Sequence, residues 1–239
     1  MRFRSSLVFT LAAALCILPM LFGGSVRASQ SDNSFPTPPP LDQSKLTDGW
    51  KQIHFKFEVQ HPYNLPLSDR YFYDQRDDIH HLWVFFTDKP HLPPPNRTTA
   101  RTEIAIEPYS SAPHLFDADY YVMPGTFACV MQLFRGNSGP GLLLVVSPNG
   151  RLSELRSGKV LASNVFNHWF NLKVVHYPGV RNGVTIYVND VLRYTFNIKR
   201  SKAYYFKCGV YSREKSKKSE VFIHAIRCWV KNPTTQPVE

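Results

Sequence analysis

The chain has 239 residues, of which 43% are hydrophobic, 14% aromatic and 19% charged, and its formal net charge is +10. A chain of this length can bury a substantial core, so disulfide bonds need not carry its stability. The sequence has no GxSxG, P-loop, GxGxxG or RNA-binding aromatic motif. We therefore expect no nucleic acid partner, because only the net charge would favour one.

The first 28 residues have the features of a secretory signal peptide. A basic start precedes an apolar run from Leu7 to Phe22, and a small-residue cleavage site ends at Ala28. The run is too short for a membrane anchor, so none is expected after cleavage. Cleavage removes three basic residues and no acidic one, which leaves 25 basic and 18 acidic residues and a charge of +7.

Cleavage would also remove Cys16 and leave Cys129, Cys208 and Cys228. Three cysteines cannot all pair, and we expect reduced, packed thiols, although a bridge between Cys129 and Cys208 stays possible if their strands are neighbours. No spacing typical of metal ligands occurs, so no metal or other cofactor is expected. Asn96 begins the sequon NRT in a predicted loop, which suits glycosylation.

The remaining chain divides into three parts. Residues 29–45 form a Pro-rich leader and residues 232–239 a tail, both predicted to be disordered. Between them, residues 46–231 show short aromatic and β-branched runs separated by turn signals, without a helical period. The runs are 80–87, 101–108, 126–134, 141–147, 168–177, 183–198, 204–211 and 220–230. This pattern predicts an all-β jelly-roll sandwich of two packed sheets.

Three of these runs have an unusual face. Successive side chains of a strand point to opposite sides, so Phe206, Cys208 and Val210 share an apolar face. The other face of that run holds Tyr205, Lys207, Gly209 and Tyr211. By the same alternation Ile104 and Ile106 oppose Arg101 and Glu103, and Cys129, Met131 and Leu133 oppose Val130, Gln132 and Phe134.

If the three apolar faces join one core, the opposite face of that sheet gathers donors suited to a carboxylate. Arg101 can grip a carboxylate with two parallel hydrogen bonds, and Lys207 adds a point charge. Gln132 and Tyr211 add directed hydrogen bonds. A plainer alternative is that Arg101 and Glu103 form a surface ion pair without any ligand.

The motifs RTEI, VMQLF and YYFKCGVY resemble the signature strands of the alginate lyase superfamily, with patterns R-S/T-E-L, Q-I/V-H and Y-F-K-A-G-x-Y-N-Q. The segments HLWVFFTDKPH and LASNVFNHWFNLKVVH resemble its plant citrate-binding-protein-like branch. The resemblance spans roughly residues 46–230. It implies a concave jelly-roll sheet with the three signature strands side by side and residues 204–211 in the middle.

In the lyases of this superfamily, the reaction is β-elimination at a uronate. The resemblance implies that Arg101 and Gln132 neutralise the C5 carboxylate, that a histidine removes the C5 proton, and that Tyr211 protonates the departing O4. Phe134 occupies the histidine's position here, and Ser212-Arg213 replace the final Asn-Gln. A phenyl ring cannot accept a proton, whereas a positioned base contributes about 10²- to 10⁴-fold.

The favoured hypothesis is therefore a secreted protein that binds a small, citrate-like polycarboxylate or an acidic polysaccharide, in the apoplast, the cell wall or the vacuole. Its expected ligand-binding residues are Arg101, Glu103, Gln132, Phe134, Lys207 and Tyr211. A polysaccharide lyase weakened by Phe134 is the first alternative, with Arg101, Gln132 and Tyr211 as its catalytic residues. A basic wall-associated structural protein is the second alternative.

Overall fold

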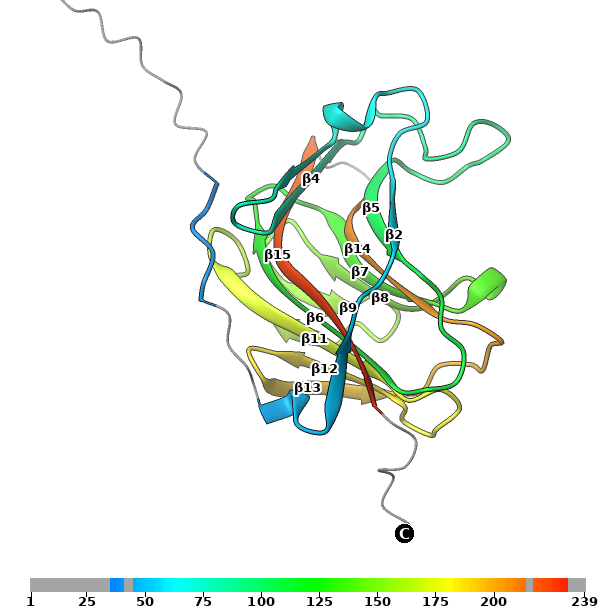
Figure 1. The fold of residues 1–239 in the computed structure, drawn as a ribbon. Helices are drawn as coiled ribbons and strands as arrows, with labels where there is room; N and C mark the ends of the chain where they lie inside the picture. Colours follow the sequence, from blue (N-terminus) through cyan, green and yellow to red (C-terminus); the bar gives the residue numbers. More distant parts are fainter. Residues whose placement is uncertain (1–34, 41–44, 214–216, 232–239) are drawn as a thin grey trace, which may run out of the picture. The chain divides into compact units, whose positions relative to one another are not determined.

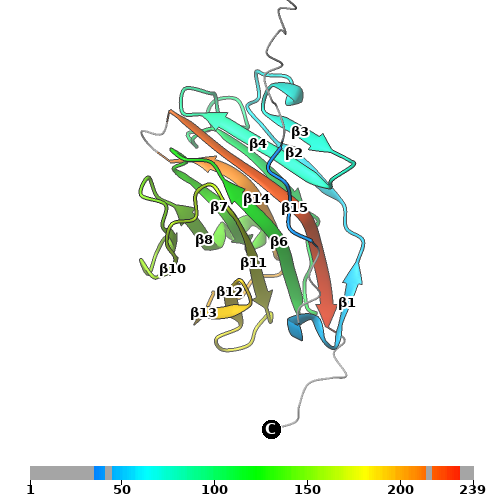
Figure 2. The same ribbon diagram turned by 90° about the vertical axis from the view of Figure 1, so that its left-hand side faces the viewer.

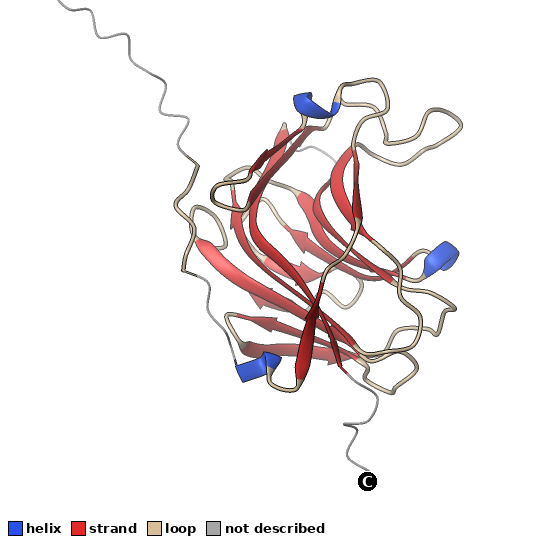
Figure 3. Ribbon diagram, viewed as in Figure 1, coloured by secondary structure: helices blue, strands red, loops and turns tan. Residues whose placement is uncertain are grey.

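The structure is a computed structural model that describes residues 35–40, 45–213 and 217–231. The predicted signal peptide and C-terminal tail lie outside these residues, so the predicted domain boundaries stay a prediction. Among the described residues from Pro36 onward, which belong to one compact unit, two antiparallel β-sheets pack face to face (Figure 1, Figure 3). The predicted jelly-roll sandwich is confirmed. No helix among the described residues is long and apolar enough to cross a membrane.

The first sheet has eight strands, and its long strand β15 pairs along its length with three others. The order is β13 (Val191–Phe196), β12 (Val184–Val188), β11 (Trp169–His176), β6 (His114–Val122), β15 (Lys218–Lys231), β4 (Ile79–Phe85) and β3 (Tyr71–Asp74), while β1 (Trp50–Ile53) also pairs with β15. Asn189 and Asp190 have positive φ angles and form the two-residue turn between β12 and β13.

The second sheet has seven strands and carries the three signature strands at its centre. Its order is β10 (Val160–Ala162), β9 (Leu152–Glu154), β8 (Pro140–Val146), β7 (Ala128–Phe134), β14 (Tyr205–Ser212), β5 (Arg101–Ile106) and β2 (Phe57–Gln60). The strand β14 lies between β5 and β7, as the family resemblance implies. The described residues also include three short 3₁₀ helices, Lys45–Thr47, Leu67–Asp69 and Gly136–Ser138.

The core lies between the two sheets. On β14 and β5 the predicted inward faces are confirmed, since Phe206, Cys208, Val210 and Ile104 all belong to the buried core cluster. The opposite face of the seven-stranded sheet, called the groove face below, carries Arg101, Glu103, Cys129, Gln132, Phe134, Tyr205, Lys207 and Tyr211.

The predicted faces are wrong in the first half of β7. Val130 and Met131 both point into the core cluster, because the pairing of β7 with both neighbours shifts by one residue there. Such a β-bulge breaks the alternation of side chains. As a result Cys129 pairs with Tyr211 and lies on the groove face instead of the core face.

Candidate functional site

Glu103 lies at the centre of the groove face and is almost completely buried, with 1% of its surface exposed. One carboxylate oxygen accepts a hydrogen bond from Nη1 of Arg101 at 3.3 Å and lies 3.8 Å from Nζ of Lys207. The other oxygen accepts a short hydrogen bond from Nε2 of Gln132. Three of the four predicted donors therefore converge on one carboxylate, which belongs to the protein, whereas Tyr211 contacts Arg101 through its ring.

The register of the strands explains this convergence. Gly209 on β14 pairs directly with Glu103 on β5, and its φ angle of +135° is one that residues with a side chain rarely adopt. A Cβ atom at this position would lie 2.4 Å from the carbonyl oxygen of Thr102 and 2.9 Å from Cα of Glu103. Only glycine lets the two backbones approach so closely beside the buried carboxylate.

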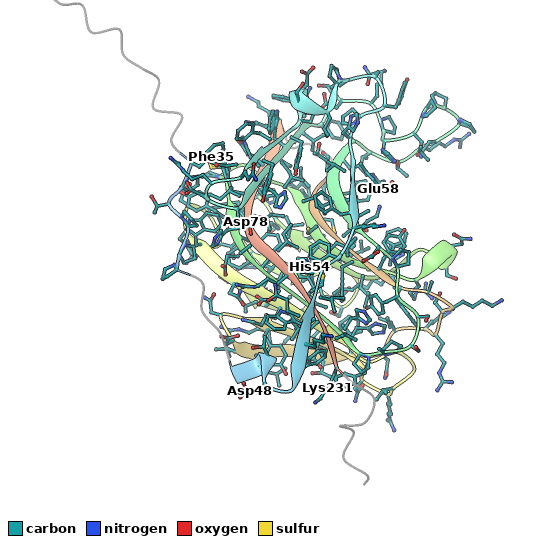
Figure 4. The ribbon with its side chains drawn as sticks, viewed as in Figure 1. Phe35, Asp48, His54, Glu58, Asp78 and Lys231 are labelled. Atoms are coloured by element: carbon teal, nitrogen blue, oxygen red, sulfur yellow. The ribbon has the colours of Figure 1, made fainter. Side chains whose placement is uncertain are left out.

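The side chain of Lys207 extends from β14 across β5 to the edge strand β2. Its Nζ donates to Oε1 of Gln60 on β2 at 2.5 Å and lies 4.9 Å from the ring centroid of Phe134. Burial lowers the pKa of Lys207, while the negative charge of Glu103 opposes this effect. Gln60 in turn donates to Glu58 at 2.8 Å, on the same strand. Figure 4 labels Glu58 on β2.

Arg101 keeps part of its hydrogen-bonding capacity unused. Its guanidinium lies over the ring of Tyr211, with 3.9 Å between Cζ and the ring centroid. Its Nε is buried and has no hydrogen-bond partner among the described residues. A guanidinium offers five N–H donors, so an acceptor that enters the groove can still bind here.

The rings of the groove face form its apolar part. Phe134 stacks on Tyr205 with 5.2 Å between the ring centroids, and both rings are half-buried. Tyr205 also borders a hollow of about 310 Å³ whose lining includes Glu58 and Gln60. The polar floor formed by Arg101, Glu103 and Lys207 is thus flanked by aromatic walls and an open pocket.

His91 is a residue of this site that the sequence did not single out. It lies in the loop between β4 and β5, and its Nδ1 donates to the carbonyl oxygen of His61 at 3.2 Å. Because Nδ1 carries the proton, Nε2 of the neutral ring is an acceptor. Burial lowers the pKa of His91, and the positive charges of Arg101 and Lys207 lower it further. An imidazole that is neutral at pH 7 therefore lies near the two cations.

Gln60 and His91 have no sequence signal of their own. Gln60 is on a four-residue edge strand, which is too short to show a clear pattern, and His91 is one of nine histidines without ligand-like spacing. The groove face brings all six predicted ligand-binding residues together.

The described residues contain no group of three or more His, Cys, Asp or Glu side chains that could hold a metal ion.

The sequence also makes predictions about the three cysteines and about Asn96. Cys129, Cys208 and Cys228 are free and buried, as predicted. The prediction that Cys129 and Cys208 share a core face is wrong, because Cys208 points into the core and Cys129 does not. Asn96 lies in the loop before β5, where its Oδ1 accepts from the backbone N–H of Thr98 at 2.8 Å. Its glycosylation stays a prediction.

A family model described as alginate lyase matches residues 41–236. The chain belongs to the alginate lyase family. A protein named citrate-binding protein from Hevea brasiliensis is 34% identical to it over 172 residues, which cover 70% of each chain. The predicted resemblance to this family and to its citrate-binding-protein-like branch is confirmed.

Solved structures of this family have the same fold. Alginate lyase AlgAT5 from polysaccharide lyase family 7 superimposes with a TM-score of 0.57, at 15% identity, over 72% of this chain and 93% of that chain. The alginate lyase from Corynebacterium sp. gives a TM-score of 0.57 at 14% identity, over 72% of this chain and 92% of that chain. At these identities the likeness concerns the fold.

Proposed function

We propose that this protein binds carboxylate ligands, either a small polycarboxylate such as citrate or the uronate units of an acidic polysaccharide, on its groove face. The observation that carries this proposal is the convergence of Arg101, Lys207 and Gln132 on the single carboxylate of Glu103. These three side chains already form the surroundings that a carboxylate requires. The name of the Hevea brasiliensis relative, citrate-binding protein, agrees with this proposal.

The ligand would use the donors that Glu103 leaves unused. Arg101 makes one hydrogen bond to Glu103, through Nη1, its buried Nε has no partner among the described residues, and its guanidinium lies over the ring of half-buried Tyr211. Each charge-assisted hydrogen bond contributes about 1.5 to 3 kcal/mol. After the cost of association, two or three such bonds correspond to dissociation constants from about micromolar to millimolar. Phe134 and Tyr205 would support the carbon skeleton of the ligand.

Calorimetric titration with citrate and with oligouronates tests the proposal. Arg101→Ala and Lys207→Ala should each weaken binding by about tenfold or more, because each removes a charge-assisted contact. The charge-matched controls are Arg151→Ala and Lys199→Ala, which change exposed residues outside the predicted ligand-binding set. Unfolding curves of all four variants establish that they are folded. Equal affinity of the groove variants and the controls would contradict the proposal.

A second candidate function is β-elimination on a uronan, and His91 is the observation that favours it. Phe134 cannot remove a proton, but the neutral imidazole of His91 is held by the carbonyl of His61, next in the chain to the Lys207 partner Gln60. In such a reaction the base takes the C5 proton, the C4–O4 bond breaks, a C4=C5 double bond forms and an acid protonates O4. Incubation with alginate, glucuronan and pectate, followed by the absorbance of the unsaturated product, distinguishes this lyase activity from binding alone.

A further inference from the structure

The outer face of the eight-stranded sheet, opposite to its core face, carries a row of rings across four neighbouring strands. His81 on β4 pairs with Phe222 on β15, Phe222 pairs with Tyr121 on β6, and Tyr121 pairs with Trp169 on β11. Paired residues of antiparallel strands point to the same face. The ring centroids of successive members are 4.2, 6.2 and 5.5 Å apart. These four residues are called the aromatic row.

Beside the aromatic row, the same face carries a polar cluster. Its members are Asp117, Asp119, Asn171, Lys173, Asp190, His224 and Arg227. Nδ2 of Asn171 donates to Asp117 and to Asp119 at 2.9 Å each, and Nζ of Lys173 donates to Asp190 at 2.6 Å. Three carboxylates thus face the cations of Lys173 and Arg227, and Nδ1 of His224 lies 3.3 Å from Asp119.

The aromatic row and the polar cluster meet at a hollow of about 270 Å³. Its lining includes Trp169 from the row and Asp119, Asp190 and Arg227 from the cluster. Pro39 and Pro40 of the Pro-rich leader also line it. Figure 2 shows residues 36–40, in blue, running beside β15 and β6 on this side of the sheet. The hollow therefore lies between the sheet and a segment of the chain's own leader.

We propose that this outer face is a second binding site, which takes a neutral saccharide chain. Pockets for such ligands combine aromatic surfaces with a few directed polar groups. Pyranose rings present apolar C–H faces that suit the rings of Trp169 and Tyr121, and their hydroxyls both donate and accept. Asp119 and Asp190 would accept from hydroxyls, while Arg227 would donate to them. The three carboxylates of the cluster would repel those of a uronan, so the cluster favours an uncharged chain.

The leader segment covers one end of this site. Pro36, Pro38 and Pro39 are half-buried, and proline-rich segments bind aromatic surfaces in an extended form without internal hydrogen bonds. Four of the five residues 36–40 are prolines, which have no backbone N–H to donate to the polar cluster. A saccharide that reaches the hollow must therefore compete mainly with apolar contacts of the prolines, and loosening of the segment should increase its affinity.

Titration of the full chain with cellohexaose, xylohexaose and mannohexaose tests this second site. At least one of these should bind, and replacement of residues 36–40 by glycine and serine should increase its affinity several-fold. Trp169→Ala should lower the affinity about tenfold or more. Asp190→Asn, at a partly exposed side chain of the hollow, is a milder change that should also weaken binding.

Two controls separate the sites. Trp50→Ala removes a tryptophan from β1, which pairs with the far end of β15, and should leave binding of the neutral hexasaccharide unchanged. Arg101→Ala should also leave it unchanged, because Arg101 lies on the other sheet. The proposal is overturned if neither the wild type nor the leader variant binds any of the three saccharides. It is equally overturned if both Trp169→Ala and Asp190→Asn bind as tightly as the wild type.

Discussion

Nη1 of Arg101 and Oε2 of Glu103 are 3.3 Å apart in an ion pair whose side chains are 9% and 1% exposed. Lys207 shares the same carboxylate oxygen at 3.8 Å, so one buried negative charge faces two cations. Removal of one partner from a buried ion pair leaves an uncompensated charge and commonly costs about 3 to 5 kcal/mol. Glu103 is therefore expected to stabilise the fold and to compete with any anionic ligand of the groove.

Glu103→Gln should have two opposite effects. The free energy of unfolding should fall by a few kcal/mol, because Arg101 and Lys207 lose their shared countercharge. The affinity for citrate should rise, because a ligand carboxylate no longer competes with that of Glu103. Urea unfolding with and without citrate measures both effects, and citrate should stabilise the variant more than the wild type. An equal effect of citrate on both proteins would contradict a role of Glu103 as internal competitor.

Gly209→Ala should strongly destabilise the protein. The new Cβ would lie 2.4 Å from the backbone oxygen of Thr102, in a backbone conformation with φ +135°. We expect a loss of at least about 2 kcal/mol, since backbone strain and steric overlap add. Gly158→Ala is the matched control, because Gly158 has φ +68° but a Cβ added there would have no neighbouring atom within 4 Å. Similar losses in the two variants would mean that close approach to β5 does not matter.

Arg101→Lys should weaken carboxylate binding nearly as much as Arg101→Ala. Lysine keeps the positive charge but loses the planar fork that binds a carboxylate with two parallel hydrogen bonds. Titration at low and at high salt separates the two contributions, because salt screens the remaining point charge more than the directed bonds. Arg151→Lys is the control at an exposed position. A lysine variant that binds like the wild type would show that charge alone holds the ligand.

The sequence predicts the central strands and most of their faces because burial on one side imposes a period of two. Residues 204–211 follow this rule, and Phe206, Cys208 and Val210 do lie in the core. The rule fails at Val130 and Met131, where a bulge places two successive side chains in the core. Nothing in the run ACVMQLF signals that extra residue, since all of its members are compatible with either face.

Strands with polar centres are also hard to predict from sequence. β6 contains Asp117 and Asp119, which interrupt its apolar pattern, and none of the predicted runs covers it. Both carboxylates are buried because Asn171 donates to each of them. The hydrogen-bond and ion-pair partners of Lys207 and Arg101 likewise depend on the tertiary structure. Glu103 occupies the donors that we expected to bind a ligand. This outcome depends on strand register, which a single sequence does not specify.

The stability of the protein should fall as the pH decreases from about 6.5 to about 4. Burial lowers the pKa of His80 to about 4, while its unfolded pKa is near 6.5. Between these two pH values the unfolded chain binds more protons than the folded protein. The free energy of unfolding therefore decreases as the pH decreases. His80 alone should contribute about 3 kcal/mol to this loss. His176, with a pKa lowered to about 3 by burial, acts in the same direction.

His80→Gln should therefore flatten this pH dependence. The variant is less stable at pH 7, because it loses the packing of the imidazole between Tyr71 and Tyr73 and its hydrogen bond of 2.8 Å with the Tyr71 hydroxyl. Its unfolding free energy should change less between pH 7 and pH 4.5 than that of the wild type. His168→Gln, at an exposed position, should keep the wild-type slope. An unchanged slope in His80→Gln would rule out His80 as the titrating group.

Phe134→His should increase the rate of β-elimination on a uronan. The half-buried ring of Phe134 lies 4.9 Å from Nζ of Lys207, so an imidazole in its place would stand beside the polar floor formed with Glu103. A positioned general base contributes about 10²- to 10⁴-fold. Any slow turnover by the wild type should instead depend on His91, which makes His91→Gln the informative second variant.

The dependence of the elimination rate on pH tests whether His91 acts as the base or has only a structural role. Because burial and the nearby cations lower the pKa of His91 below its ordinary value, wild-type turnover should extend to lower pH than an ordinary imidazole base would allow, and decline as His91 becomes protonated. His91→Gln should abolish this turnover without loss of citrate binding. If the wild type cleaves a uronan at ordinary enzyme rates, and Tyr211→Phe abolishes the cleavage, the main function is elimination and carboxylate binding is only its first step.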